Sequence, residues 1–340
     1  MEIDGSYGEG GGQILRTALA LAAITGQAMH ISPIRPNRPR AGLRPQHLTG
    51  ARAVCEITGG ELSGDVIGST ELAFRPGTPR PGSYTFDVAE ETQSAGSVPL
   101  LAQTLLPVAA AAGGEWEFVL RGGTHVPFSP TFEYLDQVFL PAVCQMGVDA
   151  GACLARAGFY PRGGGEMRLV SRGWPFRRPI ARTGPQEIER VTLQCLLSEL
   201  DDAIAQRCLS TATSGLPRHL VRAATRQVVS VPAEGPGVVV WVRLDGPCGA
   251  AGFSALGERR KRAEVVGREA ALSVGEYVIA GQPVDARLAD QLLLYMALTD
   301  APSTIAVERV SLHTTTSIHV IEAFLGPLFS IDDHRISRRG

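Results

Sequence analysis

The stretch near the N-terminus that decides the fold reads Ile3-Asp-Gly-Ser-Tyr-Gly-Glu-Gly-Gly-Gly-Gln-Ile-Leu-Arg16. Alanine, leucine and isoleucine dominate from Gln13 to Thr25, and Gly26 follows them. Because these residues favour helices and glycine commonly ends one, the pattern predicts a helix over residues 13–25. At the N-terminus of this helix the first backbone N–H groups have no partner within the helix, and they lie with the positive end of the helix dipole next to a glycine cluster. The stretch therefore indicates a phosphate site or, alternatively, a tight turn.

The single carboxylate of this cluster, Glu9, favours the phosphate interpretation. Neither common nucleotide motif is present, since no Gly-Lys-Ser/Thr follows the glycines and the G-x-G-x-x-G spacing fails at Gln13. A carboxylate amid flexible backbone is poorly placed for packing but well placed to hold a divalent cation against phosphate oxygens.

Composition sets broad limits on the class of protein. The chain has 340 residues, 44% of them hydrophobic, which is enough for a large core and more than one domain. No apolar run is long enough to cross a bilayer, and the N-terminus lacks a basic, apolar signal segment, so a cytoplasmic location without membrane partners is expected. Six scattered cysteines without a C-x-x-C pair indicate neither a zinc site nor a disulfide framework.

Positive charge is almost entirely arginine, although the net charge of −2 gives no overall attraction to nucleic acid. Lys261 is the only lysine, so an enzyme that forms a lysine–nucleotide bond would have no other candidate. Four arginines and no acid occur in the proline-broken segment Arg35-Pro-Asn-Arg-Pro-Arg-Ala-Gly-Leu-Arg-Pro-Gln-His47. This favours an anion site over a solvated basic loop.

A pattern of helix, strand, polar loop, helix and strands occurs three times. In the first unit it covers helix 13–25, strand 29–34, loop 35–47, helix 45–58 and strands within 61–76. In the second it covers strand 83–88, the Gln93–Ser97 segment, helix 98–112, strand 116–120, loop 121–130, helix 132–146 and strand 158–170. In the third it covers helix 289–299, strand 304–310, loop 312–317, helix 318–324 and strand 329–337. We expect the three polar loops to converge around one centre.

The segment between the second and third units differs from both. An arginine- and proline-rich linker over residues 171–189 precedes strands at 191–197 and 237–244 and helices at 203–210 and 262–280. We therefore predict a core made of residues 1–184 and 281–340, with a small inserted domain at 185–280.

His313 is the titratable residue of most interest, because it lies among hydroxyl residues in a predicted loop. Neutral imidazole is a nucleophile near pH 7. The alternative, an ordinary loop histidine, remains open from the residues alone, as it does for His47, His125 and His319. No metalloprotease helix, serine elbow or cysteine nucleophile motif competes with it.

Six ordered motifs are spread along nearly the whole chain: Asp4–Arg16, Ile34–Leu48, Ser94–Ser97, Arg121–Thr124, Gly158–Gly165 and Leu312-His313-Thr. In these motifs the sequence resembles RNA 3'-terminal phosphate cyclases nearly end to end. It implies an α+β core of three repeated units, each a four-stranded sheet with two helices, similar to enolpyruvyl transferases. It also implies that the insert is a thioredoxin-like α/β domain.

The resemblance further implies an ATP-dependent reaction on RNA with a 3'-phosphate end. The histidine, here His313, attacks the α-phosphate of ATP and becomes adenylylated, AMP passes to the RNA 3'-phosphate, and the 2'-hydroxyl displaces AMP to give a 2',3'-cyclic phosphate. Activation by AMP is chemically reasonable, because a phosphate monoester is a poor electrophile.

Site residues follow from the matching motifs. Glu9 would hold Mg²⁺ or Mn²⁺. Phosphates of ATP and RNA would contact Arg16, Arg35, Arg38 and Gln46 around His313. The nucleotide would contact Gly10, Gly11, Gly12, Gln103, Pro130, Phe253, Arg287, Asp290 and Gln291.

Two departures from the family pattern concern the adenine pocket. Arg287 stands where the family has a base-stacking tyrosine, and Phe253 matches a stacking phenylalanine only approximately. Because arginine also stacks on bases, the resemblance implies a changed nucleotide pocket.

Two rival functions remain. Non-catalytic relatives that serve ribosome assembly lack the histidine, and an enolpyruvyl transferase would leave the His313 motif unexplained. A homodimer is left open.

Overall fold

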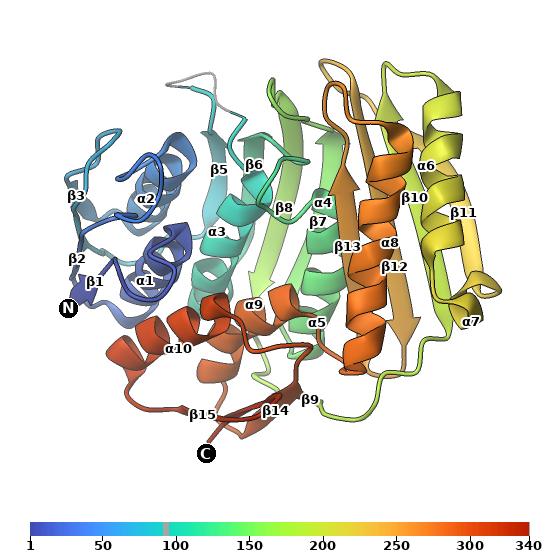
Figure 1. The fold of residues 1–340 in the computed structure, drawn as a ribbon. Helices are drawn as coiled ribbons and strands as arrows, with labels where there is room; N and C mark the ends of the chain where they lie inside the picture. Colours follow the sequence, from blue (N-terminus) through green and yellow to red (C-terminus); the bar gives the residue numbers. More distant parts are fainter. Residues whose placement is uncertain (91–94, 340) are drawn as a thin grey trace.

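The computed structural model describes residues 1–90 and 95–339, and these form four mixed four-stranded sheets with helices packed against them (Figure 1). The predicted motif residues Gln93 and Ser94 lie outside the described residues. An α+β class is therefore confirmed, and three of the sheets share one topology.

The first unit contains the N-terminal sheet. Its strands are β1 (Glu2–Asp4), β2 (Met29–Ser32), β4 (Leu72–Arg75) and β3 (Glu61–Ser63), in that spatial order. The β1–β2 pair is parallel and the other two pairs are antiparallel. The predicted helices are confirmed as α1 (Gly12–Thr25) and α2 (Pro45–Thr58), each ended by a left-handed glycine, Gly26 or Gly59.

The second unit repeats this order with β5 (Gly82–Asp87), β6 (Trp116–Gly122), β8 (Gly165–Gly173) and β7 (Asp149–Arg156). Its first helix is α3 (Val98–Ala112), as predicted. The predicted helix at 132–146 is divided into α4 (Phe132–Tyr134), a π-helical turn η1 (Leu135–Phe139) and α5 (Leu140–Gln145). Strand β7 was not predicted.

The third unit has the order β9 (Ala181–Arg182), β14 (Ser303–Ala306), β16 (Arg335–Arg338) and β15 (Phe329–Asp332), with helices α9 (Ala286–Ala297) and α10 (Leu312–Leu325). One prediction here is wrong: residues 312–317 form the first turns of α10, not a loop. The reason is the N-cap residue Ser311, whose Oγ accepts a hydrogen bond from Thr314 N at 3.1 Å, so that the helix begins at Leu312.

A fourth sheet lies between β9 and β14 in the sequence. It has the order β11 (Ala224–Ser230), β10 (Arg190–Ser198), β12 (Gly237–Gly246) and β13 (Gly249–Leu256). Helices α6 (Asp202–Gly215), α7 (Arg218–Val221) and α8 (Ala263–Ala280) accompany it, and a separate cluster of buried apolar side chains joins α6 and α8 to the sheet. The division into domains at residues 184 and 281, and the thioredoxin-like topology, stay predictions.

Helix α1 is central to the arrangement that positions the cavity. It packs against α2, α3 and α10, which belong to all three units (Figure 1). Leu15, Leu19 and Leu21 are at most 1% exposed, so contacts surround the helix rather than covering one stripe. Among residues 1–90 and 95–339, no helix is both long and apolar enough to cross a membrane.

Candidate active site

A cavity of about 840 Å³ brings together the predicted polar segments of the three units. Glu9, Arg35 and Arg38 come from the first unit, Pro130 from the second and His313 from the third. The cavity also reaches the fourth sheet through Ser254 to Leu256. The expectation that the three segments converge is therefore confirmed.

Two helix N-termini border this cavity, those of α1 and α10. Gly11 caps α1 without any side-chain hydrogen bond, which leaves the first N–H groups of the helix without a side-chain acceptor. Gly12 has no room for a larger residue, because a Cβ atom there would meet His47 Nε2 at 2.2 Å. The glycine cluster thus lets α1 begin directly against α2, and both helix dipoles favour an anion here.

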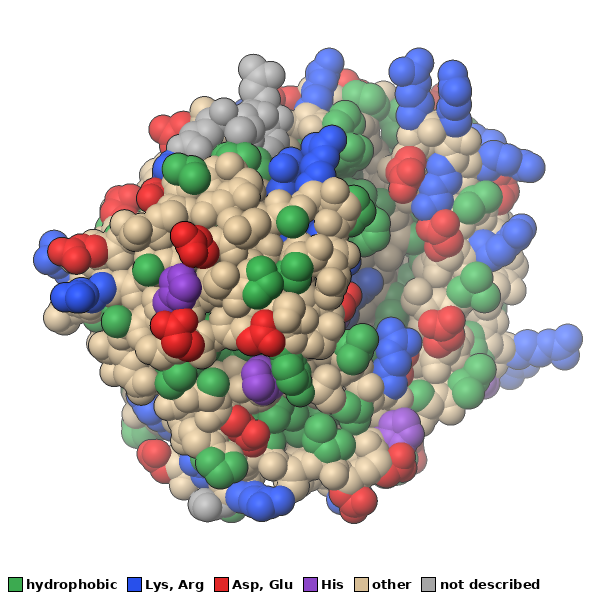
Figure 2. Space-filling view, turned by 60° about the vertical axis from the view of Figure 1, so that its left-hand side comes forward, with side chains coloured by type: hydrophobic (Ala, Val, Ile, Leu, Met, Phe, Trp, Pro, Cys, Tyr) green, Lys and Arg blue, Asp and Glu red, His purple; other side chains and the backbone are tan. Residues whose placement is uncertain are grey.

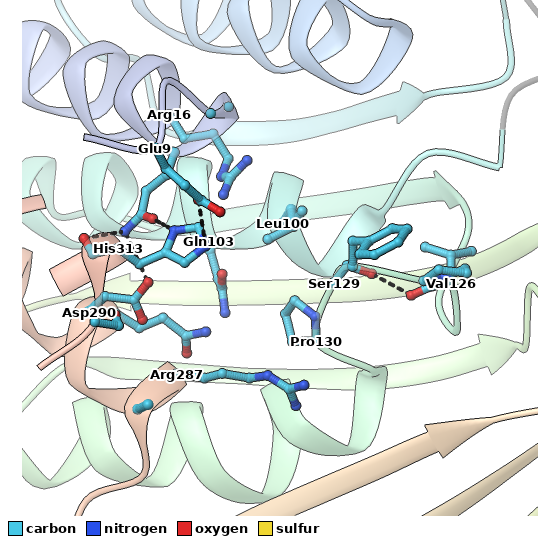
Figure 3. A pocket seen from close by; sticks show the side chains of 18 of the residues that line it. Glu9, Arg16, Leu100, Gln103, Val126, Ser129, Pro130, Arg287, Asp290 and His313 are labelled. Carbon is cyan, nitrogen blue, oxygen red and sulfur yellow. Dashed lines mark hydrogen bonds and ion pairs between the residues drawn. The ribbon is translucent and has the colours of Figure 1, made fainter. Parts of the chain in front are cut away.

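His313 lies in the first turn of α10 and contacts Gln13. It also contacts Glu9 (Figure 3). Its Nδ1 is hydrogen-bonded to Gln13 Oε1, and its Nε2 lies 2.8 Å from Glu9 Oε2. Burial lowers the pKa of His313, while the Glu9 charge opposes this shift. Burial therefore favours the neutral imidazole that a nucleophile requires, whereas the nearby Glu9 carboxylate favours the charged ring.

Gln13 is held in one orientation by groups on two other helices. Its amide Nε2 donates hydrogen bonds to Asp290 Oδ2 at 3.0 Å on α9 and to Ser317 Oγ on α10. The amide oxygen is thereby directed at His313, and because an amide oxygen only accepts, His313 Nδ1 must carry the hydrogen. This leaves Nε2 as the ring nitrogen that can present a lone pair.

The arginines form a positive group on one side of Glu9. Arg38 pairs with Glu9 Oε1 at 2.9 Å, while Arg35 has a positive φ of 53° and donates to the Arg40 and Gly42 carbonyls. Burial, followed by the charges of Arg38 and neighbouring Arg44, lowers the pKa of Arg35. A bound anion would relieve this mutual repulsion.

Burial affects two further groups behind these arginines. It lowers the pKa of Arg16 to about 10, with Asp290 and Glu9 opposing the shift. It also lowers the pKa of His47 well below its ordinary value, and the nearby arginines add to that effect. Positive charge is thus concentrated in a confined space, which suits a phosphate group.

The other predicted residues lie at different depths around the cavity. Gln103, Gln291, Arg287 and Pro130 line it, and Figure 3 shows Pro130 and Arg287 facing the same region beyond His313. Gln103 Nε2 and Gln291 Oε1 are buried without a hydrogen-bond partner. Such groups usually mark a place where a ligand or water supplies the missing bond.

Three predicted residues are placed differently. Gln46 lines the cavity, but its Oε1 accepts a hydrogen bond from Ser97 N at 3.0 Å, which ties α2 to α3. Gly10, with a φ of 57°, shapes the turn before α1 and does not line the cavity. Phe253 does not line it either: the ring is 7% exposed and lies 5.3 Å from that of Tyr277 on α8.

Sequence reasoning missed Gln13 as a site residue, and it also missed Ser317 and Phe128. A signal for Gln13 existed, since Gln13, Arg16, Thr17 and Ala20 follow helical spacing and all line the cavity. Ser317 carried no such signal, because its residue range was predicted to be a loop.

Comparisons with known proteins agree with this geometry. The family model described as RNA 3'-terminal phosphate cyclase matches residues 7–331. The RNA 3'-terminal phosphate cyclase of Methylococcus capsulatus is 43% identical over 331 residues, covering 95% of this chain and 91% of its own. That of Trichormus variabilis is 42% identical (95% and 94% covered), and that of Pyrococcus abyssi 40% (97% and 94%). The chain belongs to the RNA 3'-terminal phosphate cyclase family.

Proposed function

We propose that the protein uses ATP to convert an RNA 3'-phosphate end into a 2',3'-cyclic phosphate, with His313 as the nucleophile. The observation that carries the proposal is the His313 imidazole, oriented by Gln13 at the edge of a cavity that also holds Glu9 and the arginines. Membership of the cyclase family supports the same reaction.

The first step is transfer of AMP to the protein. His313 Nε2 attacks the α-phosphorus of ATP, a P–N bond forms, and the P–O bond to pyrophosphate breaks. For this attack Nε2 must carry no hydrogen and must leave its 2.8 Å contact with Glu9 Oε2. Gln13 keeps the ring hydrogen on Nδ1, so Gln13 is a positioning residue for the attacking nitrogen.

The next two steps take place on the RNA. An oxygen of the RNA 3'-phosphate attacks the phosphorus of His313-bound AMP, the P–N bond breaks, and RNA(3')pp(5')A forms. The 2'-hydroxyl then attacks the terminal RNA phosphorus, loses its proton, and AMP leaves with the bridging oxygen. Arg16, Arg35 and Arg38 stabilise the phosphate charge in these steps, because their guanidinium groups line the cavity.

A divalent cation fits the donor atoms at Glu9. Asp290 Oδ1 is buried without a hydrogen-bond partner, Glu9 Oε2 has the His313 imidazole 2.8 Å away, and both residues line the cavity. Oxygen donors suit Mg²⁺ or Mn²⁺, and such ions commonly bind one or two carboxylates together with substrate phosphates. No cluster of three or more His, Cys, Asp or Glu side chains suited to a metal occurs in the described part of the chain, so phosphate oxygens would complete the shell. When bound, the cation supplies charge neutralisation at the triphosphate.

RNA would be held mainly through its terminal phosphate. The net charge is only −2, and Figure 2 shows several Lys and Arg side chains projecting from the upper edge of one face. Attraction is therefore local, and contacts to phosphate carry no sequence information. We expect weak discrimination among 3'-terminal sequences.

The test is incubation with α-labelled ATP and Mg²⁺ or Mn²⁺ without RNA, followed by denaturing electrophoresis. A protein label that is acid-labile, alkali-stable and absent from His313→Ala supports a phosphoramidate at His313. His319→Ala, on the same helix but outside the cavity lining, is the matched control. Absence of label in the wild type, despite measured ATP binding, would favour a non-catalytic relative, and binding of phosphoenolpyruvate instead would favour a transferase.

A further inference from the structure

Phe128 is an aromatic residue whose setting is unusual on two counts. Its side chain is fully exposed (105%), although it lines the cavity described above. Its φ is +60°, which bulky residues rarely adopt and which glycine would adopt without strain. An exposed ring held by a strained backbone is a common sign of a binding function.

The loop that carries Phe128 has a rigid base. His125 Nε2 lies 2.9 Å from Glu133 Oε2, both side chains are buried, and the His125 ring stacks on Phe159 at 5.1 Å. Ser129 Oγ donates a hydrogen bond to the Val126 carbonyl at 2.9 Å, which closes the turn around the ring. The backbone that carries Phe128 is therefore held in place, and little backbone entropy is lost when a ligand contacts the ring.

Other phenylalanine and tyrosine side chains around the cavity offer no comparable surface. Among its described lining residues, Phe139 and Tyr295 are only 1% and 2% exposed. Phe253, predicted to stack on adenine, faces Tyr277 on the opposite side of β13. Among the described residues that line this nucleotide-sized cavity, Phe128 is therefore the one with an exposed phenyl ring.

We propose that Phe128 is a stacking platform for a nucleobase. The inference rests on the proposed function, which places two base-bearing molecules in the cavity: ATP and the 3'-end of the RNA. Every base has a π-face, and stacking on an aromatic side chain is sequence-tolerant. The chemistry is the same for the adenine of ATP and for a base near the RNA 3'-end, so the experiment has one arm for each.

The test compares Phe128→Ala and Phe128→Trp with Phe176→Ala, an exposed phenylalanine (66%) that does not line the cavity. One arm measures the ATP dependence of His313 labelling without RNA. The other measures the RNA dependence of cyclisation at saturating ATP, using an oligonucleotide with normal 3'-terminal bases and one with abasic 3'-terminal positions.

Loss of one stacked base should raise one KM about 5- to 150-fold in Phe128→Ala, with restoration by Phe128→Trp. A rise in the KM for ATP identifies adenine. A rise in the KM for normal RNA, with no rise for abasic RNA, identifies an RNA base. Both KM values within twofold of wild type and Phe176→Ala would overturn the inference. Failure of wild-type labelling would instead overturn the proposed function, so the two failures are distinguishable.

Discussion

Asp290→Asn is expected to stabilise the ligand-free protein at neutral and alkaline pH while slowing adenylylation. Burial raises the pKa of Asp290 to about 7, and the hydrogen bond from Gln13 and the charge of Arg16 offset that burial only in part. Above pH 7 the wild-type protein therefore holds an ionised Asp290 carboxylate in buried surroundings that favour the neutral acid. Asparagine has nearly the same shape, can still accept a hydrogen bond from Gln13 Nε2, and removes the charge.

The size of the effect follows from the displacement of the pKa from 3.8 to about 7. Each pH unit corresponds to about 1.4 kcal/mol, so the cost of ionised Asp290 above pH 7 is at most about 4 kcal/mol. Between pH 4 and 7 the folded wild type binds the proton more tightly than the unfolded chain. Its stability relative to Asp290→Asn therefore grows as pH falls through this range, and the advantage of the variant disappears near pH 4.

Thermal unfolding at pH 8 and pH 5 tests this reasoning, with exposed Asp300→Asn as the matched control. At pH 8 the Tm of Asp290→Asn should exceed that of the wild type by up to about 5 °C. At pH 5 this difference in Tm should be less than half as large. An Asp290→Asn protein that is no more stable than wild type at pH 8, or whose advantage does not shrink at pH 5, would refute the argument. The labelling rate should fall several-fold, because a neutral amide holds Gln13 less firmly than a carboxylate.

Three other predictions concern the same region. Gln13→Met should slow single-turnover labelling of His313 about tenfold, the worth of one hydrogen bond, and an unchanged rate would show that Gln13 does not orient the ring. Glu9→Gln should raise the Mg²⁺ concentration needed for labelling by about 10- to 100-fold in a metal titration, whereas an unaltered titration would exclude Glu9 as a ligand. Glu133→Gln should lower Tm at pH 7 by about 1–4 °C, because the buried hydrogen bond between the Glu133 carboxylate and His125 is weakened. That contact lowers the pKa of Glu133 despite burial, so the loss of Tm should shrink as acid protonates the wild-type carboxylate. A difference in Tm that does not change with pH would count against this reasoning.

Local patterns were enough to predict most of the repeated core. The bounds of α2 and α3 match the predicted ranges because prolines and glycines mark their ends. The loop prediction for residues 312–317 was wrong. Three consecutive β-branched threonines disfavour a helix, but Ser311 and Thr314 form a capping box that begins one. Burial of Thr314 and Ser317, together with the hydrogen bond from Gln13 on α1 to Ser317 Oγ, then outweighs the low propensity.

The candidate site was predictable as a set of residues but not as a set of contacts. Gln13 and His313 are separated by 300 residues, and no local pattern indicates which ring nitrogen meets the amide. Strand β13 was not predicted, so the face of the sheet that the Phe253 ring occupies could not be assigned from the sequence. In β13 Ser254 faces the cavity, and the alternation of a strand directs Phe253 to the other side.

The interrupted third sheet has a consequence for synthesis of the protein. Strand β9 ends at Arg182 and its parallel partner β14 begins at Ser303, with the entire fourth sheet between them. During translation the first two units can pack as soon as they emerge, but β9 has no strand partner until nearly all of the chain has been made. Closing so long a loop carries an entropic cost that grows only slowly with length. If the fourth sheet folds early, it brings the end of β9 and the start of β14 closer together. Helix α10, which carries His313, therefore packs among the last parts of the chain, and a chain that stops before α10 lacks the nucleophile.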